Sequence, residues 1–148
     1  MAVIVVSACL LGCDCRYDGK NCNNDAIRAL ARDNVILAVC PEQMGGLPTP
    51  RNPAEIQGGC VVSKAGRDVT AEYTKGAQTA LQLAQLNNAK YAVLKAKSPS
   101  CGKGLIYDGT FSGGKVAGNG VAAELFIKNG IEVFTEGELD KLMDILKK

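Results

Sequence analysis

The stretch Ala2-Val3-Ile4-Val5-Val6-Ser7-Ala8-Cys9 decides the fold. It opens with an uninterrupted apolar and mostly β-branched run, which is typical of a buried strand in a parallel sheet. The run ends in Ser7-Ala8-Cys9, and an irregular, cysteine-rich stretch follows from Gly12 to Asn24. A cysteine therefore stands where the first predicted strand meets its loop.

Further apolar segments and helical patterns alternate along the rest of the chain. Strands are expected at residues 35–39, 91–94 and 131–134, and a hairpin at 59–69 with Ala65-Gly66 at its turn. Helices are expected at 25–33, 70–86, 119–130 and 135–146, with Asn24, Thr70 and Asn119 as caps and Thr135 with Glu138 as a capping box. Residues 41–53 carry prolines and glycines throughout, so regular structure is not expected there.

This alternation predicts an α/β fold: a Rossmann-like open parallel sheet with flanking helices, in a single domain over residues 1–148. Cys9 and Cys40 then lie at the carboxyl ends of their strands, and Cys101 lies in the loop after the third strand. Ligands of open α/β sheets bind in the crevice outside those strand ends. We therefore expect these three cysteines to converge at one edge of the sheet.

Composition narrows the classes of function. The chain has seven cysteines and no histidine, which removes the usual catalytic zinc ligands, the Cys–His pair and the Ser–His–Asp triad. A net charge of +2 and the absence of tryptophan argue against a nucleic-acid partner. No apolar run approaches the roughly 20 residues of a membrane span, and the opening run lacks a signal peptide's positive leader. A cytoplasmic protein with thiol or metal chemistry is expected.

The neighbours of the three cysteines favour a metal centre. Any one of them can be an inert core residue, because free cysteine is often buried. Two of the cysteines instead have polar neighbours: Pro41-Glu42 follows Cys40, and Ser-Pro-Ser precedes Cys101. These neighbours offer the N–H and hydroxyl groups that sulfur ligands need. A structural zinc site takes four ligands, whereas an iron–sulfur cubane on three cysteines leaves one iron open as a Lewis acid.

The remaining cysteines leave an alternative open. Cys13, Cys15 and Cys22 can join Cys9 in a local zinc or thiol-redox site, although the spacing is a poor match to paired Cys-x-x-Cys knuckles. Cys60 is expected to serve packing.

Several blocks resemble the thiouracil desulfidase-like family, in the same order and across nearly the whole chain. The blocks are Ser7-Ala8-Cys9-Leu10-Leu11-Gly12, Arg16-Tyr17-Asp18-Gly19, Cys40-Pro41-Glu42-Gln43-Met44-Gly45-Gly46-Leu47-Pro48-Thr49-Pro50-Arg51, Lys97-Ser98-Pro99-Ser100-Cys101-Gly102 and Ile106-Tyr107-Asp108-Gly109-Thr110-Phe111-Ser112-Gly113.

The resemblance implies a Rossmann-type domain that removes sulfur from a small thiolated substrate such as 2-thiouracil without net redox change. It implies a [4Fe-4S] cluster on Cys9, Cys40 and Cys101. It also implies that Glu42 moves protons and that Ser98 orients the base or relays a proton. The expected substrate contacts are Ser100, Arg16 and Asp18.

Each of these roles has a structural alternative. Glu42 can cap a turn or pair with Arg51, and Ser98 and Ser100 can fix the turn around Pro99. Arg16 and Asp18 can form a structural ion pair. The glycines of residues 109–114 can form a hairpin rather than cradle an anion.

Two departures from the family pattern, Cys13 and Cys22, bear on the function. An extra thiol near Cys9 can close the open iron as a fourth ligand. A non-catalytic iron–sulfur or sulfide carrier, or a sensor, therefore stands as the rival to the desulfidase.

Overall fold

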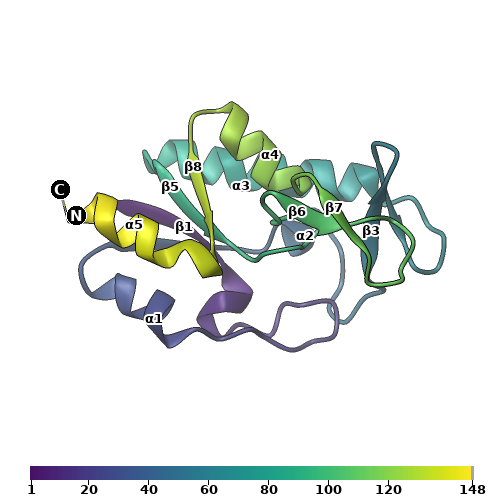
Figure 1. Cartoon of the computed structure of the whole chain (residues 1–148), viewed down its shortest axis with the longest axis horizontal. Coiled ribbons are helices and arrows are strands. Elements are labelled where there is room, and N and C mark those ends of the chain that lie inside the picture. The colour runs from purple at the N-terminus through teal and green to yellow at the C-terminus, as the bar shows by residue number, and fades with distance from the viewer. Residues whose placement is uncertain (148) are drawn as a thin grey trace.

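The computed structural model describes residues 1–147 and has a four-stranded parallel sheet with helices on both faces (Figure 1). The strand order is β2-β1-β5-β8, and all neighbouring pairs are parallel. This confirms the predicted Rossmann-like α/β sheet. The strands are β1 (Val3–Ser7), β2 (Val35–Val39), β3 (Ala54–Gln57), β4 (Cys60–Ser63), β5 (Tyr91–Leu94), β6 (Leu105–Tyr107), β7 (Lys115–Ala117) and β8 (Glu132–Thr135). The α-helices are α1 (Asp25–Arg28), α2 (Pro41–Met44), α3 (Thr70–Leu86), α4 (Val121–Lys128) and α5 (Leu139–Leu146), with 3-10 turns at Ala8–Leu11, Ala29–Arg32 and Glu136–Glu138.

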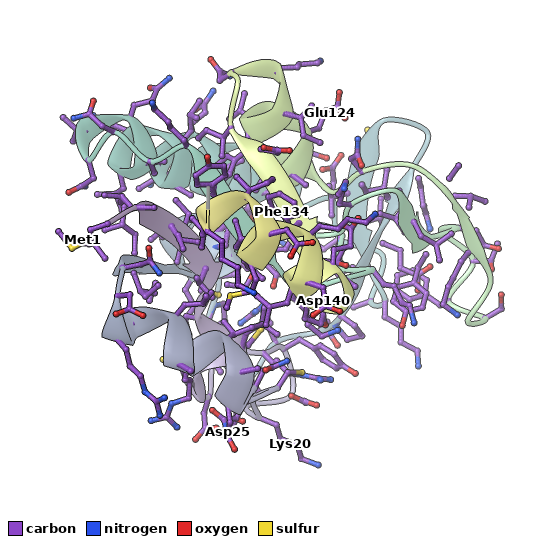
Figure 2. All side chains as sticks on the ribbon, turned by 60° about the vertical axis from the view of Figure 1, so that its left-hand side comes forward. Met1, Lys20, Asp25, Glu124, Phe134 and Asp140 are labelled. Atoms are coloured by element: carbon purple, nitrogen blue, oxygen red, sulfur yellow. The ribbon has the colours of Figure 1, made fainter. Side chains whose placement is uncertain are left out.

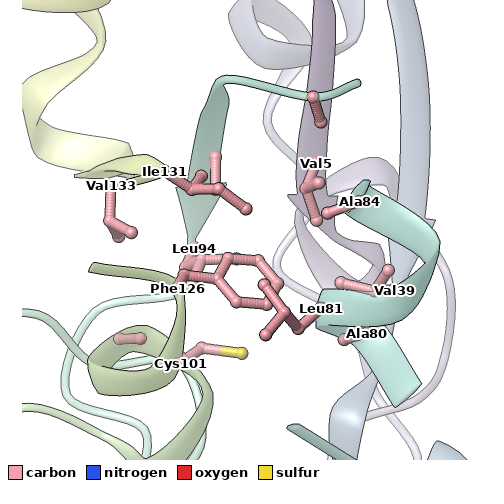
Figure 3. Close-up of a cluster of buried hydrophobic side chains, with 13 residues drawn as sticks. Val5, Val39, Ala80, Leu81, Ala84, Leu94, Cys101, Phe126, Ile131 and Val133 are labelled. Carbon is pink, nitrogen blue, oxygen red and sulfur yellow. The ribbon is translucent and has the colours of Figure 1, made fainter. Parts of the chain in front are cut away.

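The first strand is buried on both faces, as its apolar run predicted. Val5 packs with α3 and α4 in one cluster, where Phe126 of α4 is fully buried (Figure 3). Ile4 and Val6 face the opposite cluster, which contains residues of α1 and α5. Side chains of a strand alternate between faces, so a continuous apolar run is what a strand between two helical layers requires.

The strand order places a crevice at the carboxyl end of β1. The chain passes from β1 to β2 on one side, and β5 then pairs with the other side of β1. Connections that leave a strand in opposite directions separate at its carboxyl end, which is where open α/β sheets bind ligands. Cys9, Cys40 and Cys101 all follow strands that meet at this edge.

The segment 41–53 is not entirely irregular, which corrects the prediction for it. Pro41 begins the one-turn helix α2, with Cys40 in the preceding cap position. Proline suits the first position of a helix, because its φ is already helical and its missing N–H has no partner there. The proline was therefore a start signal for a helix rather than evidence against one.

The predicted hairpin at 59–69 is present, because Val62 and Asp68 form an antiparallel bridge, and a further strand before it extends the pairing. The regular antiparallel pair is β3 with β4, and it turns at Gly58-Gly59, where both glycines have positive φ. Ala65-Gly66 belongs to the next turn, closed by the bond from Gly66 N–H to Ser63 O. The glycines of residues 109–114 join β6 to the antiparallel β7, which supports the hairpin explanation for them.

Two of the four predicted helix caps are confirmed, and two are wrong. The Asn24 side chain accepts from Ile27 N–H at 3.1 Å, and Thr135 with Glu138 forms the capping box. Val69 and Gly120 hold the cap positions of α3 and α4, without side-chain cap bonds. The Thr70 hydroxyl instead accepts from Val61 N–H at 2.8 Å, which ties α3 to β4. Asn119 Oδ1 accepts from Gly104 N–H at 2.8 Å.

Helices α2 and α3 approach each other unusually closely through two glycines. A Cβ atom on Gly76 of α3 would lie 1.7 Å from the Pro41 carbonyl oxygen, and one on Gly45 would lie 1.9 Å from the Glu72 carbonyl oxygen. Both contacts are with backbone, which cannot rotate away as a flexible side chain can. The lack of side chains at both positions therefore allows this packing.

We expect Gly76→Ala to lower the free energy of unfolding by about 1–3 kcal/mol, because the added methyl forces the two backbones apart. The control is Gly137→Ala, since a Cβ there would meet its nearest neighbour, Thr135 Oγ1, at an ordinary 3.7 Å. Urea unfolding of the two variants and the parent measures the difference. Equal stability of the Gly76 variant and the control would contradict the close contact.

Candidate functional site

A cavity of about 380 Å³ lies at the carboxyl ends of β1, β2 and β5. Its walls come from the loops after these strands, from β3, and from the β6–β7 hairpin. Figure 2 shows Lys20, in the cysteine-rich loop before α1, and Asp25, at the start of α1, on the opposite side of the molecule from Glu124 of α4. The lining includes Cys9, Cys15, Arg16, Tyr17, Cys40, Glu42, Glu55, Lys64, Lys95, Lys97, Ser98, Cys101, Tyr107 and Phe111.

The structure brings Cys9, Cys40 and Cys101 to this one cavity from three separate parts of the chain. Cys9 lies on the 3-10 turn after β1, and Cys40 stands immediately before α2. Cys101 follows β5 and packs beside the apolar cluster of α3 and α4 (Figure 3). Neither Cys13 nor Cys60 lines the cavity, and both are exposed.

Cys15 is a fourth thiol that lines the cavity, together with the three predicted ligands. Its neighbour in the sequence, Cys13, is exposed and does not line the cavity. Cys15 is 6% exposed, and its carbonyl oxygen accepts from the Cys40 thiol at 3.7 Å. The Cys40 thiol lowers the pKa of Cys15, but the Cys9 thiol and burial outweigh it and raise that pKa to about 11. The Cys-x-Cys pair is thus divided between cavity and solvent.

The donor set suits an iron–sulfur cluster. Within residues 1–147, no group of three Cys, Asp or Glu side chains has the arrangement of a single-ion site. A cubane spaces its ligand sulfurs more widely than one ion does, and it takes cysteine sulfur in preference to other donors. Cys9, Cys40 and Cys101 supply that sulfur around a cavity large enough to admit more than an ion.

The hydroxyls near Cys101 suit a sulfur-ligated centre. Burial raises the pKa of the Cys101 thiol to about 12, and the hydroxyls of Ser7 and Ser100 counteract this by lowering the pKa. Ser100 Oγ is buried and has no hydrogen-bond partner in the described part of the chain. A buried hydroxyl without such a partner costs free energy, and a nearby thiolate sulfur offers it an acceptor. Ser100 does not line the cavity itself.

Glu42 reaches the cavity from α2 and is held at both carboxylate oxygens. Arg51 Nη2 donates to Oε2 at 2.8 Å, and the Tyr73 hydroxyl donates to Oε1. Arg51 Nη2 also donates to the carbonyl oxygen of Cys15 at 2.9 Å, so one guanidinium nitrogen links two residues that line the cavity. The ion pair that was one structural alternative for Glu42 therefore exists, and it fixes a carboxylate that faces the cavity.

Ser98 has both its predicted place and its alternative turn role. It lines the cavity, and its Oγ accepts from the N–H groups of Ser100 and Cys101 at 3.1 Å each. Because the oxygen accepts those bonds, the hydroxyl proton stays available for donation to a bound molecule.

Arg16 and Asp18 differ in their relation to the cavity. Arg16 lines it and donates from Nη1 to the Cys22 sulfur at 2.9 Å, while Nη2 contacts Asp18 Oδ2 at 3.2 Å. Asp18 is exposed and lies outside the lining. The expected ion pair is thus present, with its cation on the cavity side.

Nothing in the sequence predicted the role of Glu55 in the wall of the cavity. The buried Glu55 accepts from the N–H groups of Gly109 and Phe111 at 3.0 and 3.2 Å. These bonds hold Phe111 at the cavity with a φ of 56°, which is uncommon for a residue with a side chain. The partners are more than 50 residues apart in the sequence, so no local spacing signals them.

A model of the 2-thiouracil desulfurase family matches residues 4–138. The chain belongs to this family. A solved structure of the [4Fe-4S]-dependent thiouracil desulfidase TudS is 47% identical and covers 99% of both chains, with a TM-score of 0.94. The uncharacterized protein YbbK of Bacillus subtilis is 43% identical over 95% of this chain and 100% of its own length. The family resemblance predicted from the motifs is confirmed.

Within residues 1–147, no helix is both long enough and apolar enough to cross a membrane.

Proposed function

We propose that this member of the desulfurase family is a [4Fe-4S]-dependent desulfidase that hydrolyses the C–S bond of a small thiolated substrate such as 2-thiouracil. One observation carries the proposal: Cys9, Cys40 and Cys101, from three distant segments, line one cavity beside Glu42. The TudS structure, which matches the whole chain, supports both the cofactor and the substrate class.

The residues that would hold the cluster are Cys9, Cys40 and Cys101. Ser100 and Ser7 would donate to the Cys101 sulfur, which we propose as the role of Ser100 in place of direct substrate contact. When bound, the cluster supplies a Lewis-acidic iron that polarises the thiocarbonyl bond of the substrate.

Glu42 and Ser98 would move and place the protons. The Glu42 carboxylate takes a proton from water as the water oxygen bonds to the ring carbon, and it returns a proton to the departing sulfur. The thiocarbonyl and one water thus become a carbonyl and hydrogen sulfide, and no electrons are transferred. The Ser98 hydroxyl donates to the substrate or the water and thereby orients it.

Arg16 would contact the substrate, with Asp18 orienting its guanidinium from the solvent side. We also propose a cytoplasmic location and no nucleic-acid partner. Seven free cysteines suit a reducing compartment, and the net charge of +2 offers little attraction for phosphates.

The proposed function predicts turnover without a reductant. Protein loaded anaerobically with iron and sulfide should convert 2-thiouracil to equal amounts of uracil and sulfide, measured by chromatography and a colorimetric sulfide assay. Protein without the cluster serves as the control. A requirement for an electron donor would contradict hydrolysis. Full cluster content without any uracil would indicate that the substrate is another thiolated compound.

A further inference from the structure

Tyr73 is buried behind the site and reaches it only through Glu42. The residue lies on the first turn of α3, its side chain is 2% exposed, and it is not part of the cavity lining. Its hydroxyl donates to Glu42 Oε1, on the opposite oxygen from the one that Arg51 holds. Each carboxylate oxygen therefore has its own buried donor, one from α3 and one from the loop after α2.

The glycine contacts between α2 and α3 make this hydrogen bond possible. Gly76 lies three residues after Tyr73 and meets the Pro41 carbonyl, which belongs to the residue before Glu42. Gly45, at the end of α2, meets the carbonyl of Glu72. The backbones that carry the hydroxyl and the carboxylate are thus packed against each other without intervening side chains.

We propose that Tyr73 is a positioning residue that holds the Glu42 carboxylate in the orientation needed for proton transfer. The proposal rests on the proposed function, because it assigns Tyr73 no role apart from that of Glu42. With Arg51 alone, the carboxylate can pivot about a single contact, whereas two donors on separate oxygens fix its plane. Proton transfer is sensitive to such placement, since it needs hydrogen-bond distance and alignment.

Tyr73→Phe tests the proposal by removing only the hydroxyl. We expect kcat for desulfuration to fall by about 10- to 100-fold while KM changes less than about twofold, because orientation and not binding is lost. Iron content should match that of the control, Tyr91→Phe, which should keep full activity, and the thermal unfolding midpoint should stay well above the assay temperature. Tyr91 is partly buried against the other apolar cluster and lies outside the cavity lining. A kcat within twofold of the parent, or a loss confined to KM, would overturn the proposal.

A double-mutant cycle with Glu42→Gln separates this inference from the proposed function. Sensitive long-incubation assays should show that Tyr73→Phe lowers the residual kcat of the Glu42→Gln protein by less than twofold, because its target is already gone. An equal factor in both backgrounds would show that Tyr73 acts independently of Glu42 and would overturn the inference alone. Full activity of Glu42→Gln itself would instead remove the proposed role of Glu42, and the inference with it.

Discussion

Replacing Glu42 with Gln should lower kcat for desulfuration by about 100- to 10,000-fold, because the amide cannot accept a proton from water at neutral pH. The amide keeps nearly the volume of the carboxylate, so the cavity beside Cys40 should keep its shape. Iron and sulfide content should therefore equal those of the parent. Steady-state kinetics with 2-thiouracil, together with iron analysis of the same samples, measure both quantities.

Glu132→Gln is the matched control, since Glu132 is exposed on β8 and outside the cavity lining. It should leave kcat and iron content unchanged. Retained activity in the Glu42 variant would show that another group moves the protons. The carrier or sensor hypothesis makes a different prediction, because a protein that only stores a cluster would form no uracil in either variant or in the parent.

Single replacement of Cys9, Cys40 or Cys101 by Ser should reduce iron bound after anaerobic reconstitution by more than about tenfold, since serine oxygen is a poor substitute for thiolate in such clusters. The visible absorption of the cluster should be lost in parallel. Cys13→Ser and Cys60→Ser, at exposed positions, are the controls and should bind iron as the parent does.

The triple change of Cys13, Cys15 and Cys22 to Ser distinguishes the zinc or thiol-redox hypothesis. That hypothesis predicts loss of all metal binding in the triple variant. The cluster assignment predicts that iron binding survives, even though Cys15 lies at the cavity, and that it fails for Cys101→Ser. Survival of metal binding in Cys101→Ser with loss in the triple variant would contradict our ligand set.

The sheet and the convergence of the three cysteines were predictable because both follow from local patterns and from topology. The apolar run that ends at Val6 predicted a strand buried on both faces, and parallel strands place their carboxyl ends together. Cys9 and Cys40 are adjacent to strand ends, so their positions followed directly. Cys101 lies farther from β5, and its place depended on the loop between them, which the sequence pattern alone does not define.

The groups that hold Glu42 were harder to predict. Arg51 was near enough in sequence to be considered as its partner, but Tyr73 is 31 residues away on another helix. Its hydroxyl reaches Glu42 because Gly76 and Gly45 allow close packing, and neither glycine has a positive φ to mark it as special. Glu55 was hard to predict for a similar reason, because its partners Gly109 and Phe111 are more than 50 residues away in the sequence. Such long-range hydrogen bonds leave no spacing signal in one sequence.

The most direct test of the proposed function is an anaerobic crystal structure of the cluster-loaded protein, with iron located by its anomalous scattering. We expect four irons in the cavity, three of them bound by Cys9, Cys40 and Cys101, and the fourth without a protein ligand and facing the Glu42 side. A fourth bond from Cys15 or Cys22 in the active protein, or a single metal ion held within residues 9–22, would contradict the proposed ligand set.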